Sequence, residues 1–296
     1  MRGARPGATI ERALQEGPAI HSGDRVLVAC SGGPDSVALA TAVHAVSVPM
    51  DLHVALAYVH HATRESAWQD EAVVLRVAAS LGVPVRIAAL EAGPGDEAAL
   101  RDRRYAALGA VARDLGSSVV ATGHHAADQS ESVLLALFRG SGPQGLAGMR
   151  PRRGLEPGLD LARPFLRVAP ERLLAYALSS GLPYAVDPGN ADARLRRNAV
   201  RSALAALRPL FAGLDEAVAR AAGLIGDEID ASERSGLRRR VRTAVAEQEG
   251  LRDLDFLHVE QAVRAIERGG SGEFHMKRGV ALRIEDGAIS VIKKDA

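Results

Sequence analysis

The sequence has few of the residues on which several classes of protein depend. Cys30 is its one cysteine among 296 residues, which excludes a disulfide scaffold, a four-cysteine zinc site and a cysteine-ligated iron–sulfur cluster. No apolar run approaches the roughly 18 residues of a membrane helix, and no continuous apolar core follows the basic N-terminus as in a signal peptide. We therefore expect a cytoplasmic protein that makes no use of a membrane.

Lysine and aromatic residues are also scarce. Lys277, Lys293 and Lys294 are the three lysines, so arginine carries nearly all of the positive charge, and the net charge is +1. Residues 1–149 carry 12 basic and 15 acidic side chains, residues 150–210 carry 11 and 5, and residues 211–296 carry 14 and 16. The basic segment 150–210 is either a chance cluster in an arginine-rich chain or a surface for a polyanion, and composition alone leaves both readings open.

The first 140 residues alternate strand-like and helix-like segments. Four apolar runs predict strands, at Val26–Cys30, Leu52–Val59, Val83–Leu90 and Val119–Thr122. Each run precedes a segment with helical periodicity, at Ser36–Val46, Ser66–Leu81, Ala98–Leu115 and Asp128–Arg139. This order predicts an α/β fold with a Rossmann-like parallel sheet and helices on both faces.

The rest of the chain has a different texture. Residues 140–164 are rich in Gly, Pro and Arg and are predicted to form a loop. Helices are expected at 170–180, 196–207, 212–250 and 251–268, followed by short strands at 274–277, 280–284 and 289–292 around an Asp286-Gly287 turn. We expect a catalytic domain over residues 1–211 and a small, mainly helical C-terminal domain over 212–296 with a terminal β element.

A glycine-containing loop follows the first strand. It reads Ser31-Gly-Gly-Pro-Asp-Ser36 and leads directly into a helix. Gly32 and Gly33 allow a sharp turn and close approach of a ligand, while the helix N-terminus favours an anion such as phosphate. Asp35 would repel that anion unless a cation lies between them, so Asp35 is a candidate Mg²⁺ ligand. The alternative is an ordinary strand–helix turn with capping serines.

This loop resembles the signature of the PP-loop ATP pyrophosphatases without a gap. The resemblance implies ATP binding, cleavage between the α and β phosphates, and Mg²⁺. Cys30, at the strand end, is also readily explained as a small buried core residue. The ATP-binding residues implied in this sequence are Cys30, Ser31, Gly32, Gly33, Pro34, Asp35, Ser36, His60, Gly123 and His124.

Further strings, in preserved order and spacing from about residue 24 to 210, narrow the resemblance. They are Val59-His-His, Arg101-Asp-Arg-Arg-Tyr, Thr122-Gly-His-His-Ala-Ala-Asp-Gln, Gly140-Ser-Gly-Pro-Gln-Gly-Leu, Arg163-Pro-Phe-Leu, Asp187-Pro-Gly-Asn and Arg197-Asn-Ala-Val-Arg. Together they resemble the tRNA(Ile)-lysidine synthetase family. That family adenylates O2 of the wobble cytidine in a CAU-anticodon isoleucine tRNA with ATP, and the ε-amine of lysine then displaces AMP to give lysidine.

The resemblance assigns roles to particular residues. It implies Asp35, Arg104, Asp128 and Glu131 as catalytic residues, with Asp128 and Glu131 holding the lysine substrate. It also implies that tRNA contacts fall to Arg196, Arg197, Asn198 and Arg201, which gives the basic segment a use. Without the resemblance, compensation of the helix dipole would explain Asp128 and Glu131, and a solvated helix face would explain Arg104.

Some features leave alternatives open. The family usually has two adjacent aspartates where this chain has Ala127-Asp128, so one carboxylate is missing. The roles of the pairs His60-His61 and His124-His125 are not fixed by the sequence. The alternative functions are another PP-loop tRNA-modifying enzyme, such as a thiolase, or a non-catalytic nucleotide-binding module. A homodimer through the 212–250 helices is possible.

Overall fold

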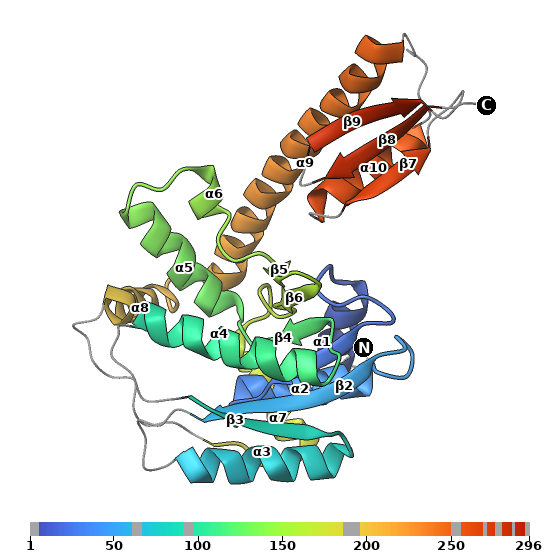
Figure 1. The fold of residues 1–296 in the computed structure, drawn as a ribbon. Coiled ribbons are helices and arrows are strands. Elements are labelled where there is room, and N and C mark those ends of the chain that lie inside the picture. Colours follow the sequence, from blue (N-terminus) through green and yellow to red (C-terminus); the bar gives the residue numbers. More distant parts are fainter. Residues whose placement is uncertain are drawn as a thin grey trace. The chain divides into compact units, whose positions relative to one another are not determined.

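The first part of the chain folds into a six-stranded sheet in a computed structural model (Figure 1). The structure describes residues 6–60, 67–90, 97–185, 196–249, 256–268, 271–275, 280–285 and 288–293. The strand order is β3-β2-β1-β4-β6-β5. The strands are β1 (Arg25–Ala29), β2 (His53–His60), β3 (Val85–Ala89), β4 (Val119–Ala121), β5 (Arg152–Glu156) and β6 (Leu159–Ala162). All neighbouring pairs are parallel except β5 with β6, which are antiparallel.

Helices cover both faces of this sheet because consecutive residues of a strand point to opposite sides. Val26 and Val28 of β1 belong to one buried cluster, whereas Leu27 between them belongs to another. The first cluster is closed by α1 (Pro6–Glu16), α2 (Pro34–Ala45), α3 (Ala67–Leu81) and α7 (Pro170–Ser180). The second is closed by α4 (Glu97–Asp114). The predicted α/β fold with a mostly parallel sheet and helices on both faces is confirmed.

The segment 140–164 was predicted as loop, and this prediction is wrong. It contains the short helix α6 (Pro143–Leu146) and the strands β5 and β6, which extend the sheet at one edge. β6 is only four residues long, and β5 is a half-exposed edge strand with the sequence Arg-Arg-Gly-Leu-Glu. Strands this short and this polar carry no clear apolar alternation.

The N-terminal helix α1 also has no counterpart among the elements expected from the sequence. Its apolar side chains Ile10 and Leu14 are fully buried, and Tyr176 of α7 donates a hydrogen bond of 3.1 Å to Glu11. Pro6 at the helix start and the four-residue spacing of Ile10 and Leu14 are the signals that sequence reasoning could have used.

Three further helices complete the α structure of the first compact unit, which runs from Met1 to Leu224. α5 (Ala126–Phe138) follows β4, and α8 (Arg196–Leu207) packs against α5. α9 (Leu214–Glu249) begins in this unit and continues into the second unit, Ile225–Ala296. The expected domain boundary near residue 212 stays a prediction, because compactness of the backbone does not show where a function ends.

The second unit has a small core of its own. Its buried residues lie on α9, on α10 (Phe256–Glu267) and on the strand β8 (Val280–Glu285), with β7 (Gly272–His275) and β9 (Ala288–Lys293) on either side of β8. The three strands are antiparallel. The predicted Asp286-Gly287 turn lies outside the described residues. None of the described helices combines the length and apolar composition that crossing a bilayer requires.

Candidate functional site

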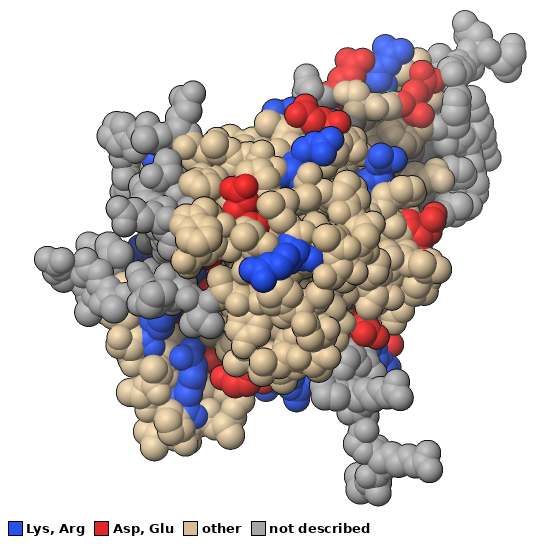
Figure 2. All heavy atoms as spheres, turned by 90° about the horizontal axis from the view of Figure 1, so that it is seen from below, with Lys and Arg blue, Asp and Glu red and all other residues tan. Residues whose placement is uncertain are grey.

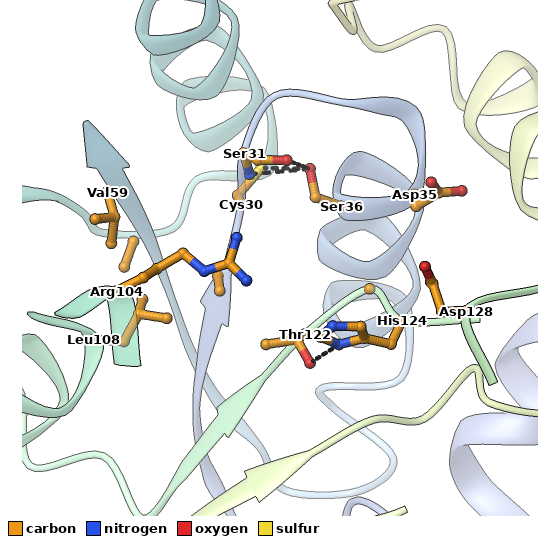
Figure 3. Close-up of a pocket in the computed structure, with 13 residues that line it drawn as sticks. Cys30, Ser31, Asp35, Ser36, Val59, Arg104, Leu108, Thr122, His124 and Asp128 are labelled. Carbon is orange, nitrogen blue, oxygen red and sulfur yellow. Dashed lines mark hydrogen bonds between the residues drawn. The ribbon is translucent and has the colours of Figure 1, made fainter. Parts of the chain in front are cut away.

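A pocket of about 230 Å³ opens at the carboxyl ends of β1 and β4 (Figure 3). The chain runs from β1 to β2 and β3 on one side and returns to β4 on the other side of β1. Such a reversal of strand order leaves a crevice at the carboxyl ends of the two central strands, which is where open α/β sheets bind ligands. The pocket is therefore a direct consequence of the topology.

The loop between β1 and α2 forms one wall of this pocket. The hydroxyl of Ser36 donates a 2.9 Å hydrogen bond to the carbonyl of Gly33 and accepts one of 3.1 Å from the backbone N–H of Ser31. Gly32 has φ +86°, and a Cβ there would lie 3.1 Å from the carbonyl oxygen of Asp70. The sequence Ser-Gly-Gly-Pro-Asp-Ser thus closes a tight loop whose following helix start presents unbonded N–H groups.

The turn after β4 approaches this loop closely. A Cβ at Gly123 would lie 3.0 Å from the carbonyl oxygen of Asp35 and 3.3 Å from the backbone nitrogen of Ser36. A Cβ at this distance would force the neighbouring backbone to shift by a few tenths of an ångström, so glycine is favoured here. Gly123 therefore allows the ends of β1 and β4 to form one site.

His124 lies on the floor of the pocket, beneath the loop from Ser31 to Ser36, which we call the phosphate loop. Its Nδ1 is 2.8 Å from Oγ1 of Thr122, which fixes the ring orientation. Burial is the main cause that holds the pKa of His124 well below its usual value, and the charges of four arginines act in the same direction. Those arginines are Arg163, Arg101, Arg104 and Arg197. His124 is therefore neutral at physiological pH.

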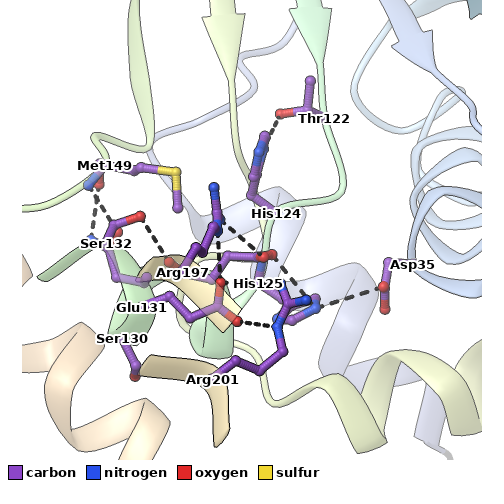
Figure 4. Close-up of polar contacts among 12 residues, drawn as sticks. Asp35, Thr122, His124, His125, Ser130, Glu131, Ser132, Met149, Arg197 and Arg201 are labelled. Atoms are coloured by element: carbon purple, nitrogen blue, oxygen red, sulfur yellow. Dashed lines mark hydrogen bonds and ion pairs between the residues drawn. The ribbon is translucent and has the colours of Figure 1, made fainter. Parts of the chain in front are cut away.

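His125 lies between two carboxylates (Figure 4). Its Nε2 is 3.6 Å from Oδ2 of Asp35 and 3.5 Å from Oδ2 of Asp128. The pKa of Asp35 is raised, mainly because its carboxyl is buried; His125 opposes this rise and the nearby Asp128 adds to it. A cation beside Asp35 would stabilise the ionised form, and Mg²⁺ needs only one or two protein carboxylates when phosphates supply the rest. The residues thus fit Mg²⁺ bound through a nucleotide.

Glu131 is paired with two arginines of α8. Arg197 donates to its Oε2 at 2.8 Å and Arg201 to its Oε1 at 2.7 Å, while the Glu131 side chain is only 3% exposed. Arg197 also lies 3.8 Å from Oδ1 of Asp128. Burial raises the pKa of Glu131, but the bonds and charges of Arg201 and Arg197 outweigh burial, so its pKa lies below the usual value. This cluster fastens α8 to α5 beside the pocket.

Arg104 enters the pocket from α4, opposite the phosphate loop (Figure 3). Its Cζ lies 5.9 Å from the ring centroid of Tyr105, and the Cζ of Arg101 lies 5.5 Å from the same centroid. Arg163, which follows β6 and is buried, donates a hydrogen bond of 3.1 Å to the carbonyl of Arg150, and its charge lowers the pKa of Tyr105. Arg104 therefore lines the pocket with Arg101 and Arg163 behind it, and we call these three arginines the cationic wall.

The pocket brings together most of the predicted nucleotide and catalytic residues. Its lining includes Cys30, Ser31, Asp35, Ser36, Arg104, Gly123, His124 and Asp128. Gly32, Gly33 and Pro34 belong to the loop but not to the lining, and Cys30 is 1% exposed. His60 lies at the end of β2, packed edge-on against Tyr58, and it does not line the pocket.

Glu131 and the predicted tRNA-contacting residues also lie outside the lining. Arg197 and Arg201, which were predicted to contact tRNA, donate hydrogen bonds to Glu131, which was predicted to bind lysine. Asn198 lies with them on α8, where the backbone of Arg196 is described but not its side chain. His61 and the Asp187-Pro-Gly-Asn string lie outside the described residues.

The resemblance places His124 and His125 in the nucleotide and substrate pocket, but the sequence reasoning gave no site role to Tyr105 or Thr122. Each is adjacent in sequence to a residue that was singled out, or stands in the same string, which was the only signal available. Their contacts join residues far apart in the chain, such as Arg163 with Tyr105. Such contacts follow from the packing of β6 and α4, which the sequence did not predict.

The fold and the phosphate loop are those of a PP-loop protein, and residues 7–207 match the model of the PP-loop domain, an ATP-binding family. The chain is 41% identical to a tRNA(Ile)-lysidine synthase of Salinispora tropica over 75% of this chain and 68% of that protein. It is 40% identical to a tRNA(Ile)-lysidine synthase of Ralstonia nicotianae over 68% of this chain and 45% of that protein. The chain belongs to the tRNA(Ile)-lysidine synthase family of PP-loop proteins.

A solved structure shares the fold at low sequence identity. A U34-tRNA thiolase from Methanococcus maripaludis, described with its 4Fe–4S cluster, superimposes with a TM-score of 0.62 and 14% identity, covering 75% of this chain and 78% of the thiolase. This likeness concerns the architecture alone. The chain described here has a single cysteine, Cys30, and it is buried.

Proposed function

We propose that this protein is a ligase that uses ATP to join the ε-amine of L-lysine to C2 of the wobble cytidine in CAU-anticodon tRNA(Ile). The observation that supports this proposal most directly is that the phosphate loop, Arg104 and the carboxylate of Asp128 face one another across a single pocket. This pocket lies at the carboxyl ends of β1 and β4, where the strand order reverses. Family membership supplies the reaction, and this pocket supplies a place for each reactant. The product would be lysidine, which pairs with A.

The reaction has two steps that share the pocket. In the first, O2 of the cytidine bonds to the α-phosphorus of ATP and pyrophosphate leaves. In the second, the lysine amine bonds to C2, the C2–O2 bond breaks, and AMP leaves with that oxygen. Arg104 would neutralise negative charge that develops on the phosphate in both steps.

The triphosphate would lie against the loop from Ser31 to Ser36. Because the hydroxyls of Ser31 and Ser36 both form hydrogen bonds within the loop, the direct donors are the backbone N–H groups at the start of α2, after Pro34. Asp35 would hold Mg²⁺, which supplies positive charge between the carboxylate and the phosphates.

Asp128 is the carboxylate that we place against the lysine amine. It lines the pocket and its side chain is 21% exposed, so a cationic substrate can reach it. Attack also requires loss of a proton from the ammonium, and a carboxylate at hydrogen-bonding distance is a suitable acceptor. Glu131 belongs to the same proposed site, but lysine binding there requires exchange with Arg197 or Arg201.

The tRNA contacts are proposed for the basic segment and α8. In the view of Figure 2, the described basic and acidic side chains are interspersed, and those that are drawn in colour form no continuous basic surface. Arg196, Arg197, Asn198 and Arg201 lie on α8 beside the pocket, where phosphates flanking the wobble base would pass. A homodimer and a cytoplasmic location belong to the same proposal.

An assay with three readouts tests the proposal against its alternatives. The protein is incubated with ATP, radiolabelled lysine and CAU-anticodon tRNA(Ile), while pyrophosphate, AMP and labelled tRNA are measured. We expect one pyrophosphate and one AMP for each lysine incorporated. Sulfur transfer without lysine incorporation would support the thiolase alternative, and ATP binding without turnover would support a non-catalytic module.

A further inference from the structure

Tyr105 lies at the centre of the cationic wall described above. Its side chain is 7% exposed, and it makes contacts with three guanidinium groups from two parts of the chain. The ring lies beneath Arg101 and Arg104, at 5.5 and 5.9 Å from the centroid, which is the range of cation–π contacts. The phenol oxygen accepts a hydrogen bond of 3.5 Å from Arg101, and the charge of the buried Arg163 also acts on the phenol.

This arrangement has an uncompensated positive charge. Within the described part of the chain, none of Arg101, Arg104 and Arg163 forms an ion pair with a carboxylate. Arg163 is only 2% exposed, so water solvates its charge poorly. Like charges at close range repel, and the repulsion is opposed by the electron-rich face of the tyrosine ring, by its oxygen and, for Arg163, by the carbonyl of Arg150 at 3.1 Å.

We propose that Tyr105 is a positioning residue: it holds Arg101, Arg104 and Arg163 as a preformed cationic wall for the phosphates of ATP. Arg104 is the member of this wall that lines the pocket, and it faces the phosphate loop. Tyr105 does not line the pocket, so it acts through the arginines. The binding of ATP phosphates by this wall does not depend on the proposed function. Only the reaction that later consumes the bound ATP rests on that proposal.

The electrostatics of the phenol agree with this geometry. Burial raises the pKa of Tyr105, but the charges of Arg101, Arg163 and Arg104 outweigh burial, and its pKa lies below the usual value. The same three positive charges that stabilise the ionised form of the phenol would stabilise the negative charge of an arriving triphosphate.

The test compares ATP and adenosine binding, measured by calorimetry, for the full chain and three variants. Tyr105→Phe keeps the ring and removes only the oxygen, whereas Tyr105→Leu removes both. Tyr176→Phe is the matched control, because Tyr176 is also a buried tyrosine with a hydrogen-bonded hydroxyl, on α7 away from the pocket lining.

We expect Tyr105→Phe to weaken ATP binding about tenfold, the usual effect of losing a hydrogen bond to a charged group, and Tyr105→Leu to weaken it further. Adenosine, which has no phosphates, should bind all variants equally. In turnover, Tyr105→Phe should raise KM for ATP more than it lowers kcat. Tyr176→Phe should match the wild type in all of these measurements.

Two results would overturn the inference. One is that Tyr105→Phe binds ATP as tightly as Tyr176→Phe, and the other is that ATP and adenosine are weakened alike, which indicates general damage to the pocket. If Tyr105→Leu fails to fold, Tyr105→Phe still decides the question. ATP binding requires neither lysine nor tRNA, so a wild-type protein that binds ATP but incorporates no lysine would refute the proposed function and leave this test intact.

Discussion

At the residue scale, the site depends on charges that the fold keeps in unfavourable surroundings. The side chain of Asp35 is 37% exposed, and its partial burial together with the nearby Asp128 raises its pKa. A raised carboxyl pKa stabilises the fold only while the group is protonated, so that contribution is present at low pH and is lost as the pH rises through the raised pKa. At neutral pH, ionised Asp35 therefore reduces stability when no cation is bound.

Replacing this carboxylate should separate stability from function. We predict that Asp35→Asn abolishes pyrophosphate release, and that without nucleotide and Mg²⁺ it unfolds at the same temperature as the wild type or higher. Thermal unfolding at pH 7 and ATP–pyrophosphate exchange measure the two effects. Asp114→Asn, at the exposed end of α4, is the control and should change neither. Pyrophosphate release at the wild-type rate would remove Asp35 from the proposed metal site.

Glu131 shows the opposite pH dependence. Its pKa is lowered by Arg201 and Arg197, so the stabilisation is present above the unfolded-state pKa of about 4.3 and is lost as the pH falls through the lowered value. Glu131→Gln should cost about 3 kcal/mol at pH 7, the lower end for breaking a buried ion pair, because both arginines retain access to water.

Urea unfolding between pH 3 and 7 measures this difference. The gap between the wild type and Glu131→Gln should begin to shrink below about pH 4.3, where the glutamate of the unfolded chain takes up a proton, and should close as the pH falls through the lowered pKa of the folded state. Glu171→Gln, on the exposed side of α7, should follow the wild type at every pH. A gap that stays constant from pH 7 to pH 3 would show that the ion pairs do not stabilise the fold.

Individual site residues could be predicted where they stand in one continuous sequence motif. Ser31, Asp35 and Ser36 stand in an uninterrupted loop motif, and Asp128 stands at the start of a predicted helix. The pairing of Glu131 with Arg201 was not predictable, because the two residues are 70 positions apart and an arginine on that helix face serves RNA equally well. Sequence spacing predicts neighbours on one element, but not contacts between two elements.

At the element scale, the edge of the sheet is where sequence reasoning failed. β5 is held by side chains as well as by pairing with β6: Arg152 bonds to Asp24 at 2.7 Å and to Asp160 at 2.8 Å. A polar strand next to a glycine-rich segment resembles a loop in sequence, because its stability comes from partners elsewhere in the chain. The strands β1, β2 and β4, by contrast, are largely buried, and they and the edge strand β3 have apolar runs that were predicted.

Arg152 should therefore contribute more to the free energy of unfolding than its neighbour Arg153. We predict that Arg152→Ala lowers the free energy of unfolding by about 2 kcal/mol, between the values for an exposed and a buried ion pair. Arg153→Ala should change it by less than about 0.5 kcal/mol, because Arg153 is exposed and bonds only to the carbonyl of Gly154 among the described residues. Chemical denaturation of both variants checks this, and equal losses would contradict the proposed role of Arg152.

At the scale of the whole molecule, a net charge of +1 conceals a basic segment in residues 150–210. The structure uses several of its arginines internally, since Arg152, Arg197 and Arg201 pair with carboxylates and Arg163 is buried. The charge available to RNA is thus smaller than the sequence count. This distribution could not be predicted, because composition does not show which charges are neutralised by neighbours.

The salt dependence of tRNA binding measures how much of that charge remains. We predict that replacing Arg196, Arg197 and Arg201 by alanine weakens binding and reduces the slope of log K against log salt by about 1 for each lost phosphate contact. The substitutions are made in the Glu131→Gln background, so that no buried carboxylate is left unpaired. Alanine at the exposed Arg12, Arg76 and Arg220 is the control, and a slope equal to that control would place the interface elsewhere.

The most direct measurement of the central claim is the mass of the wobble nucleoside after reaction. CAU-anticodon tRNA(Ile) is incubated with the protein, ATP, Mg²⁺ and lysine, then digested to nucleosides and analysed by mass spectrometry. The proposed reaction predicts a cytidine heavier by lysine less one water, formed only when ATP and lysine are both present. Unmodified cytidine, or a nucleoside that has gained sulfur, would contradict it.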